Sequence, residues 1–137
     1  MNKVGDWCAS WAPRLLSVLR IITAFLFMEH GGMKLFGFPA PMGDIPLFSL
    51  MGLAGTLEVF GGLLILIGLF TRPVAFILSG EMAFAYFMAH AKGGFWPVLN
   101  HGEAAVLYCF IYLYLASAGG GVWSLDNIVC KKHKSAA

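Results

Sequence analysis

Charged residues are scarce in this sequence, and their scarcity argues against a soluble protein. Only 12% of the 137 residues are charged, 59% are hydrophobic, and the mean hydropathy is +0.78. Soluble domains usually carry about 25% charged residues. The net charge of +2 is too small and too scattered to form a basic face that binds nucleic acid. We therefore expect the lipid bilayer, and no nucleic acid, as a partner.

Cysteine is also rare, and the usual signatures of redox cofactors are missing. Cys8, Cys109 and Cys130 form no C-x-x-C pair and lack the histidine spacing of a zinc site. The sequence has no glycine fingerprint for a flavin and no haem or iron–sulfur motif. We therefore predict no metal site and no redox centre held by this chain alone.

What the sequence does contain is a series of long apolar runs. About twenty apolar residues in a helix cross the hydrocarbon core of a bilayer. Segments rich in proline and glycine separate the runs, and such segments stop helices. The spans are expected at about 14–33, 47–70, 73–91 and 100–118. We predict an all-α integral membrane protein, a four-helix bundle formed as one domain by residues 1–137.

The distribution of basic residues predicts the orientation in the membrane. Most lie at the termini or in the turn between the second and third spans: Lys3, Arg14, Arg20, Arg72, Lys131, Lys132 and Lys134. The opposite loops hold only Lys34 and Lys92. By the positive-inside rule, both termini and the Arg72 turn face the cytoplasm. Arg20 is expected to extend toward the cytoplasmic headgroups.

Both ends of the chain are expected to lie outside the bundle. Trp7 and Trp11 suit the headgroup region, so residues 1–12 are predicted to form a partial interfacial helix before Pro13 begins the first span. Residues 122–126 are predicted to be a second interfacial segment. The Lys-rich tail that follows them is predicted to be disordered.

Two acidic residues interrupt the second and third apolar runs. Glu58 is the only ionisable residue between positions 47 and 70, and Glu81 is the only one between 73 and 89. An acid inside the membrane costs a few kcal/mol, so by default it marks a functional site. Carboxyl groups removed from water are suited to holding and passing protons, which makes both candidate catalytic residues. Alternatively, they hydrogen-bond across helices and serve only structure.

Other polar residues fall in the middle and outer half of the spans, counted at about 1.5 Å per residue. These candidate ligand-binding residues are Glu29, His30, Lys34, His101 and Glu103. Three of them have a plainer explanation to be weighed against ligand binding. Lys34 and His101 can extend to the interface, as is expected of His90 and Lys92, and Glu103 suits a helix N-terminus.

Several segments together resemble the DoxX family of small bacterial membrane proteins. They are MEHGGMKLFGF (28–38), AGTLEVFGGLLILIGLFTRPVA (54–75), GEMAFAYF (80–87), FWPVLNHGEAAVLY (95–108) and GGGVWSLD (119–126). The ordered set H-G-x-x-K-L, A-G-x-x-E, T-R-P, G-E-M-A and N-x-G-E is specific. One departure is that residues 119–121 are Gly-Gly-Gly, where the family often has Gly-Pro-Gly.

The resemblance implies a four-helix protein of the bacterial inner membrane. Through DoxD-like subunits of thiosulfate:quinone oxidoreductase, it also implies redox work near the quinone pool. The leading hypothesis is a membrane subunit of a quinone-linked oxidoreductase, with a redox-protein partner, that binds a quinone or another lipophilic molecule. A noncatalytic scaffold for a partner protein and a small proton-coupled transporter are the alternatives. The glycine-rich second span can pack within the chain or against a second copy, so a homo-oligomer stays open.

Overall fold

The computed structural model describes residues 2–135, apart from the side chains of residues 133–135, and the described part is helical without strands. Residues 1, 136 and 137 lie outside it, as does the side chain of Lys134 from the orientation argument. The helices are α1 (Lys3–Leu35), α2 (Leu50–Thr56), α3 (Gly62–Ile67), α4 (Thr71–Ala85), α5 (Pro97–Asn100), α6 (Glu103–Ala118) and α7 (Leu125–Ser135). The π-helical turns η1 (Leu57–Gly61) and η2 (Tyr86–His90) and the 3-10 turn η3 (Ala91–Gly93) extend them.

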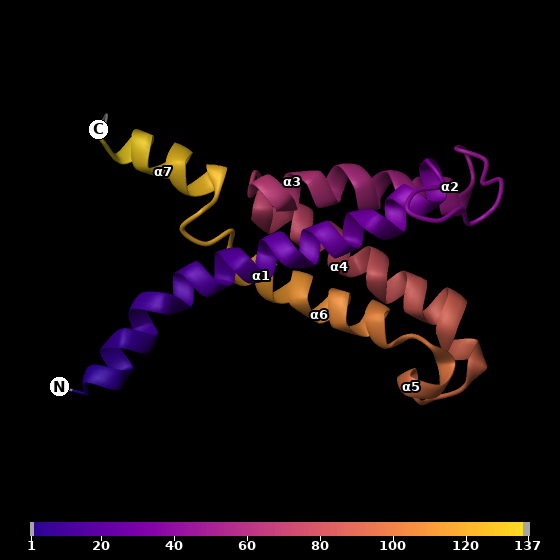
Figure 1. The fold of residues 1–137 in the computed structure, drawn as a ribbon, viewed down its shortest axis with the longest axis horizontal. Helices are drawn as coiled ribbons and strands as arrows, with labels where there is room; N and C mark the ends of the chain where they lie inside the picture. Colours follow the sequence, from indigo (N-terminus) through magenta and orange to yellow (C-terminus); the bar gives the residue numbers. More distant parts are fainter. Residues whose placement is uncertain (1, 136–137) are drawn as a thin grey trace.

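The all-α membrane fold is confirmed. Helical stretches Lys3–Leu35, Leu50–Ile67 and Thr71–Gly93 are long and apolar enough to cross a membrane, judged by length and composition. The fourth apolar helix, α6, has 16 residues and is thus roughly 24 Å long, somewhat short of a bilayer core. In Figure 1, α1 lies along α2 and α3, and α4 lies along α6.

The structure differs from the prediction at both ends of the chain. Helix α1 begins at Lys3 and runs through Pro13, so the separate interfacial helix over residues 1–12 is wrong. One proline removes a single helical hydrogen bond, and its freed carbonyl lies on the exposed part of the helix that projects beyond the bundle (Figure 1). The predicted disorder after residue 126 is also wrong, because α7 continues to Ser135. The Ser124 hydroxyl starts α7 by accepting a bond from the backbone N–H of Asn127 at 3.3 Å.

Glycines bring the first two spans together, which is one of the two arrangements that their spacing allowed. A Cβ on Gly31 would lie 2.8 Å from the carbonyl oxygen of Gly55, and a Cβ on Gly62 would lie 2.5 Å from Cγ of Met28. Any larger residue would force α1 away from η1 and α3. The glycine row of the second span thus packs within the chain.

Arg20 joins three segments at the end of the bundle nearest the chain termini. Its guanidinium is fully buried and donates to the carbonyls of Gly120 at 2.8 Å, Leu66 at 2.5 Å and Trp123 at 2.5 Å, and also to that of Ile65. The prediction that Arg20 extends to the headgroups is therefore wrong. The last carbonyls of a helix lack the usual helical donors, and Arg20 supplies a donor here; the Ile65 carbonyl also accepts from the backbone N–H of Gly68 at 3.0 Å.

Two further contacts close the same end. The Asp126 carboxylate accepts hydrogen bonds from the backbone N–H groups of Phe70 and Thr71, each at 2.8 Å, and so caps the N-terminus of α4. Arg72 donates to the carbonyl of Ser117 at 2.5 Å, near the end of α6. We call Arg20, Arg72 and Asp126 the clasp, because they tie the helix ends together and leave the other end of the bundle to hold the site.

Candidate functional site

Glu58 lies inside the bundle on the π-helical turn η1 and is 2% exposed. The ammonium of Lys34, near the end of α1, donates to its Oε1 at 2.5 Å. The second oxygen, Oε2, is buried and has no hydrogen-bond partner among the described residues. Gly31 and Gly55 hold the two backbones close enough for this contact, since a Cβ on Gly55 would meet Cβ of Lys34 at 3.0 Å. Glu58 therefore has a cationic partner and one oxygen left free.

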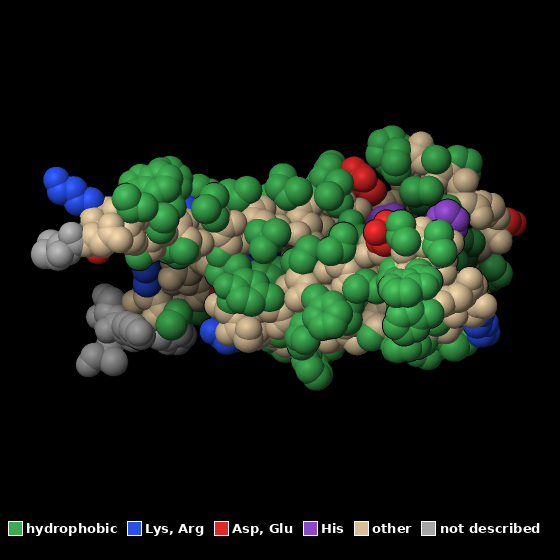
Figure 2. Space-filling model, turned by 90° about the horizontal axis from the view of Figure 1, so that it is seen from below, with side chains coloured by type: hydrophobic (Ala, Val, Ile, Leu, Met, Phe, Trp, Pro, Cys, Tyr) green, Lys and Arg blue, Asp and Glu red, His purple; other side chains and the backbone are tan. Residues whose placement is uncertain are grey.

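A small polar cavity adjoins this ion pair. Its volume is about 140 Å³, and it is lined by Phe27, His30, Lys34, Glu58, Met82, Ala85, His90, Ala104, Ala105 and Tyr108. The side chain of His30 is exposed, so the cavity wall reaches the surface. Figure 2 shows acidic and histidine side chains close together toward the end of the molecule that carries α2 and α5. The polar cavity has room for a few water molecules at roughly 30 Å³ each.

Glu81 lies on α4 beside a different space. Both its carboxyl oxygens are buried and lack a hydrogen-bond partner within residues 2–135. It lines a lateral groove of about 510 Å³ between α2 and α4, and the other lining residues carry no polar side chain. They are Leu50, Met51, Leu53, Ala54, Leu57, Ile77, Gly80, Phe84, Ala85, Met88 and Ala89. Glu81 is near enough to Glu58 and Lys34 for their charges to interact, and Ala85 lines both spaces.

The remaining predicted residues lie around this centre without all joining it. His30 lines the polar cavity together with Lys34 and Glu58. Glu29 is half-buried on α1 and close enough to Tyr108 for electrostatic interaction, but it does not line the cavity. His101 and Glu103 are exposed at the start of α6 and line neither the polar cavity nor the lateral groove. The structure thus brings together Lys34, His30 and the two acids, and leaves three predicted residues outside.

Three residues of this region were not among the predicted site residues. His90 was assigned to the interface, yet it lines the polar cavity from the π-helical turn η2. Tyr108 lines the cavity too, and its ring centroid lies 6.0 Å from that of His30. The buried Asn100 donates to the carbonyl of Gly94 at 2.8 Å and accepts from the N–H of Gly102 at 2.9 Å. The N-x-G-E motif at residues 100–103 was the signal in the sequence that could have marked this loop.

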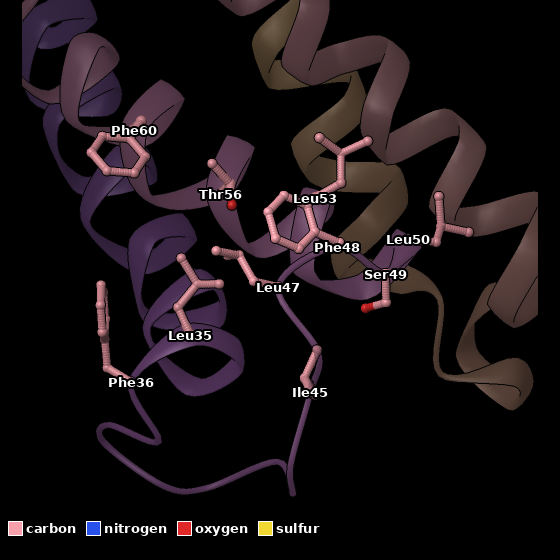
Figure 3. A pocket seen from close by; sticks show the side chains of 10 residues that line it. All are labelled: Leu35, Phe36, Ile45, Leu47, Phe48, Ser49, Leu50, Leu53, Thr56 and Phe60. Atoms are coloured by element: carbon pink, nitrogen blue, oxygen red, sulfur yellow. The ribbon is translucent and has the colours of Figure 1, made fainter.

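A larger apolar cavity of about 1020 Å³ lies between the end of α1, the loop after it, α2 and η1 (Figure 3). Its lining residues are Leu35, Phe36, Ile45, Leu47, Phe48, Ser49, Leu50, Leu53, Thr56 and Phe60. The only polar side chains among them already donate locally, Ser49 to the carbonyl of Pro46 at 2.6 Å and Thr56 to that of Gly52 at 2.8 Å. This space suits hydrocarbon but offers no free polar side chain to orient a ligand.

The chemistry of the site is that of carboxyl, imidazole, ammonium and phenol groups, which exchange protons. Within residues 2–135, no group of three or more His, Cys, Asp or Glu side chains is placed to hold a metal ion. The centre therefore consists of the Lys34–Glu58 pair on the polar cavity and the unpartnered Glu81 on the lateral groove.

Comparison with known proteins places these residues in a family. The DoxX pattern matches residues 15–91, which include Lys34, Glu58, Glu81 and His90. A Haemophilus influenzae protein is 42% identical over 89% of this chain and 96% of its own length. "Putative oxidoreductase CatD" of Bacillus subtilis is 30% identical over 86% and 89%, and "Inner membrane protein YqjF" of Escherichia coli is 29% identical over 84% and 92%. None of the solved structures matches. The chain is an integral membrane protein that belongs to the DoxX family.

Proposed function

We propose that this protein is a membrane subunit of a redox system and binds a quinone or another lipophilic small molecule at its buried cluster of carboxylate and histidine side chains. The observation that carries the proposal is the pair of unpartnered oxygens of Glu81, buried in the wall of an otherwise apolar groove. A buried carboxyl group without a partner is costly, so a ligand that bonds to it repays that cost. The oxidoreductase name of the similar Bacillus subtilis protein agrees with a redox role.

The position of each site residue indicates its role in the proposed reaction. Reduction of a quinone to a quinol takes up two electrons and two protons. A partner redox protein would supply the electrons, because the chain has no redox-cofactor motif of its own. Glu58 and Glu81 would hold and pass the protons, and Lys34 would keep Glu58 in place. His30, with Glu29, His101 and Glu103 at the same end of the bundle, would line the approach from water.

Mass spectrometry of gently purified protein tests the binding. A lipophilic molecule should copurify with the wild type and be lost from Glu81→Leu, which removes the only polar side chain of the groove. Absence of any small molecule, together with a stable protein complex that is indifferent to Glu58→Gln, would identify a scaffold instead. Proton-coupled solute flux into vesicles that contain the protein would identify a transporter.

Replacing the ionisable carboxyl group of Glu81 should abolish activity while the protein stays in the membrane. Glu81→Gln keeps the shape of the side chain, so the protein should stay inserted, but an amide cannot release a proton. We expect the effect of the protein on the redox state of extracted membrane quinones to fall by about 100-fold or more, the usual range for losing a general acid or base. Asp44→Asn, which changes an exposed acid in the loop after α1 that lines neither space, is the control and should act as wild type.

We also propose that the protein lies in the bacterial inner membrane with both termini in the cytoplasm. The asymmetry of lysine and arginine supports this orientation. A reporter fused after Gly43 should be located outside the cytoplasm, and one fused after Ala137 inside it. A cytoplasmic signal from the Gly43 fusion would reverse the orientation and place the polar cavity on the inner side.

A further inference from the structure

The two spaces beside Glu58 and Glu81 differ too much in size to take the same occupant. Ligand pockets for organic molecules usually measure about 300–1,000 Å³. The lateral groove, at about 510 Å³, falls within this range, whereas the polar cavity, at about 140 Å³, holds only water-sized molecules. A ring-sized ligand therefore fits beside Glu81 and not beside the Lys34–Glu58 pair.

The groove also offers what the larger cavity of Figure 3 lacks. Both Glu81 oxygens are available, while the hydroxyls of Ser49 and Thr56 in the larger cavity are already bonded to backbone carbonyls. A molecule with an apolar body and one hydrogen-bonding carbonyl or hydroxyl matches a groove that is apolar except for one carboxyl group. A plain hydrocarbon chain would leave that carboxyl group unbonded.

Gly80 leaves open space next to this carboxyl group. Apart from its chain neighbours and the adjoining backbone of α4, no atom of the described residues lies within 4 Å of a Cβ built on Gly80, in contrast to Gly31 and Gly62, where a Cβ would clash with a neighbouring helix. Gly80 is exposed and lines the groove. Its missing side chain is therefore not needed for helix packing, and its effect is to leave room beside Glu81.

We propose that a planar lipophilic molecule bearing a carbonyl or hydroxyl enters from the bilayer between α2 and α4, lies against Gly80, and hydrogen-bonds to Glu81. This inference rests on the proposed function and adds the route of entry and the contact residues. Protons reach Glu81 from the side opposite the lateral groove, through the polar cavity that His30, Lys34 and Glu58 line. Glu58 lines the polar cavity and does not touch the ligand.

The experiment labels purified protein in phosphatidylcholine nanodiscs with a photoreactive azidoquinone and maps the labelled peptides by mass spectrometry. Saturable labelling should fall on residues 50–57 and 77–89, which line the groove. Gly80→Phe fills the open space and should lower labelling by about tenfold or more, because the pocket no longer admits a ring. Leu107→Phe adds a ring at an exposed position of α6 outside the groove and should label as wild type.

The Glu81 variants supply a second readout. Glu81→Gln keeps a hydrogen-bonding amide and should keep most of the labelling, whereas Glu81→Leu should lose it. Labelling confined to α1 and α6 and unchanged in Gly80→Phe would overturn lateral entry but leave a quinone-binding function in place. No saturable labelling anywhere would overturn both. Gly80→Ala adds a single methyl group to this space, so it should lower labelling less than Gly80→Phe does.

Discussion

Replacing Arg20 with methionine is expected to destabilise the protein by about 4 kcal/mol or more, the sum of several hydrogen bonds to a charged donor. The guanidinium donates to four backbone carbonyls, from the end of α3 and from the segment that connects α6 to α7. Methionine has a similar apolar stem but would remove the guanidinium donor from all four carbonyls, of which that of Ile65 keeps the backbone N–H of Gly68. We expect a much lower melting temperature in detergent and less protein in the membrane.

Two other variants show whether the geometry of Arg20 matters as well as its charge. Arg20→Lys keeps the charge, but one ammonium cannot reach four carbonyls in the fork arrangement of a guanidinium, so it should restore only part of the stability. Arg14 is exposed and donates one side-chain hydrogen bond, to the carbonyl of Ser10. The variant Arg14→Met should therefore melt as wild type. A normal melting temperature for Arg20→Met would show that the clasp contributes little.

Glu58→Gln is expected to destabilise the protein by about 3 kcal/mol, because it leaves the ammonium of Lys34 largely buried without its carboxylate. The double variant Glu58→Gln/Lys34→Met removes both charges and should recover most of this loss. The measurement is a double-mutant cycle of melting in detergent, with Glu103→Gln as the exposed control. If Glu58→Gln alone melts as wild type, Glu58 already carries a proton and is not paired with Lys34 as an ion.

The cycle also separates structure from function. In the double variant the fold should return, but any proton transfer that depends on Glu58 should not. A double variant that is both stable and active would show that the Lys34–Glu58 pair is structural, which was the alternative that the sequence left open. Activity retained in Glu81→Gln as well would favour the scaffold hypothesis.

The sequence by itself determined the membrane fold and the burial of the acid in the second span. Apolar runs of membrane-spanning length have few alternatives, and the glycine row around Glu58 indicated a face that packs against a helix. The family could also be recognised, because its motifs occur in order along the chain. These features depend on residues close together in sequence, which is why a one-dimensional pattern carries them.

Only the tertiary structure decided which polar groups meet. Arg20 and Lys34 were each predicted or able to extend to the interface, and both instead bond within the protein, Arg20 to backbone carbonyls and Lys34 to the buried carboxylate of Glu58. His90 joins the polar cavity from a π-helical turn, while His101 and Glu103 point to the exterior. Such choices depend on distances between helices that are set by packing, and no spacing along the chain encodes them.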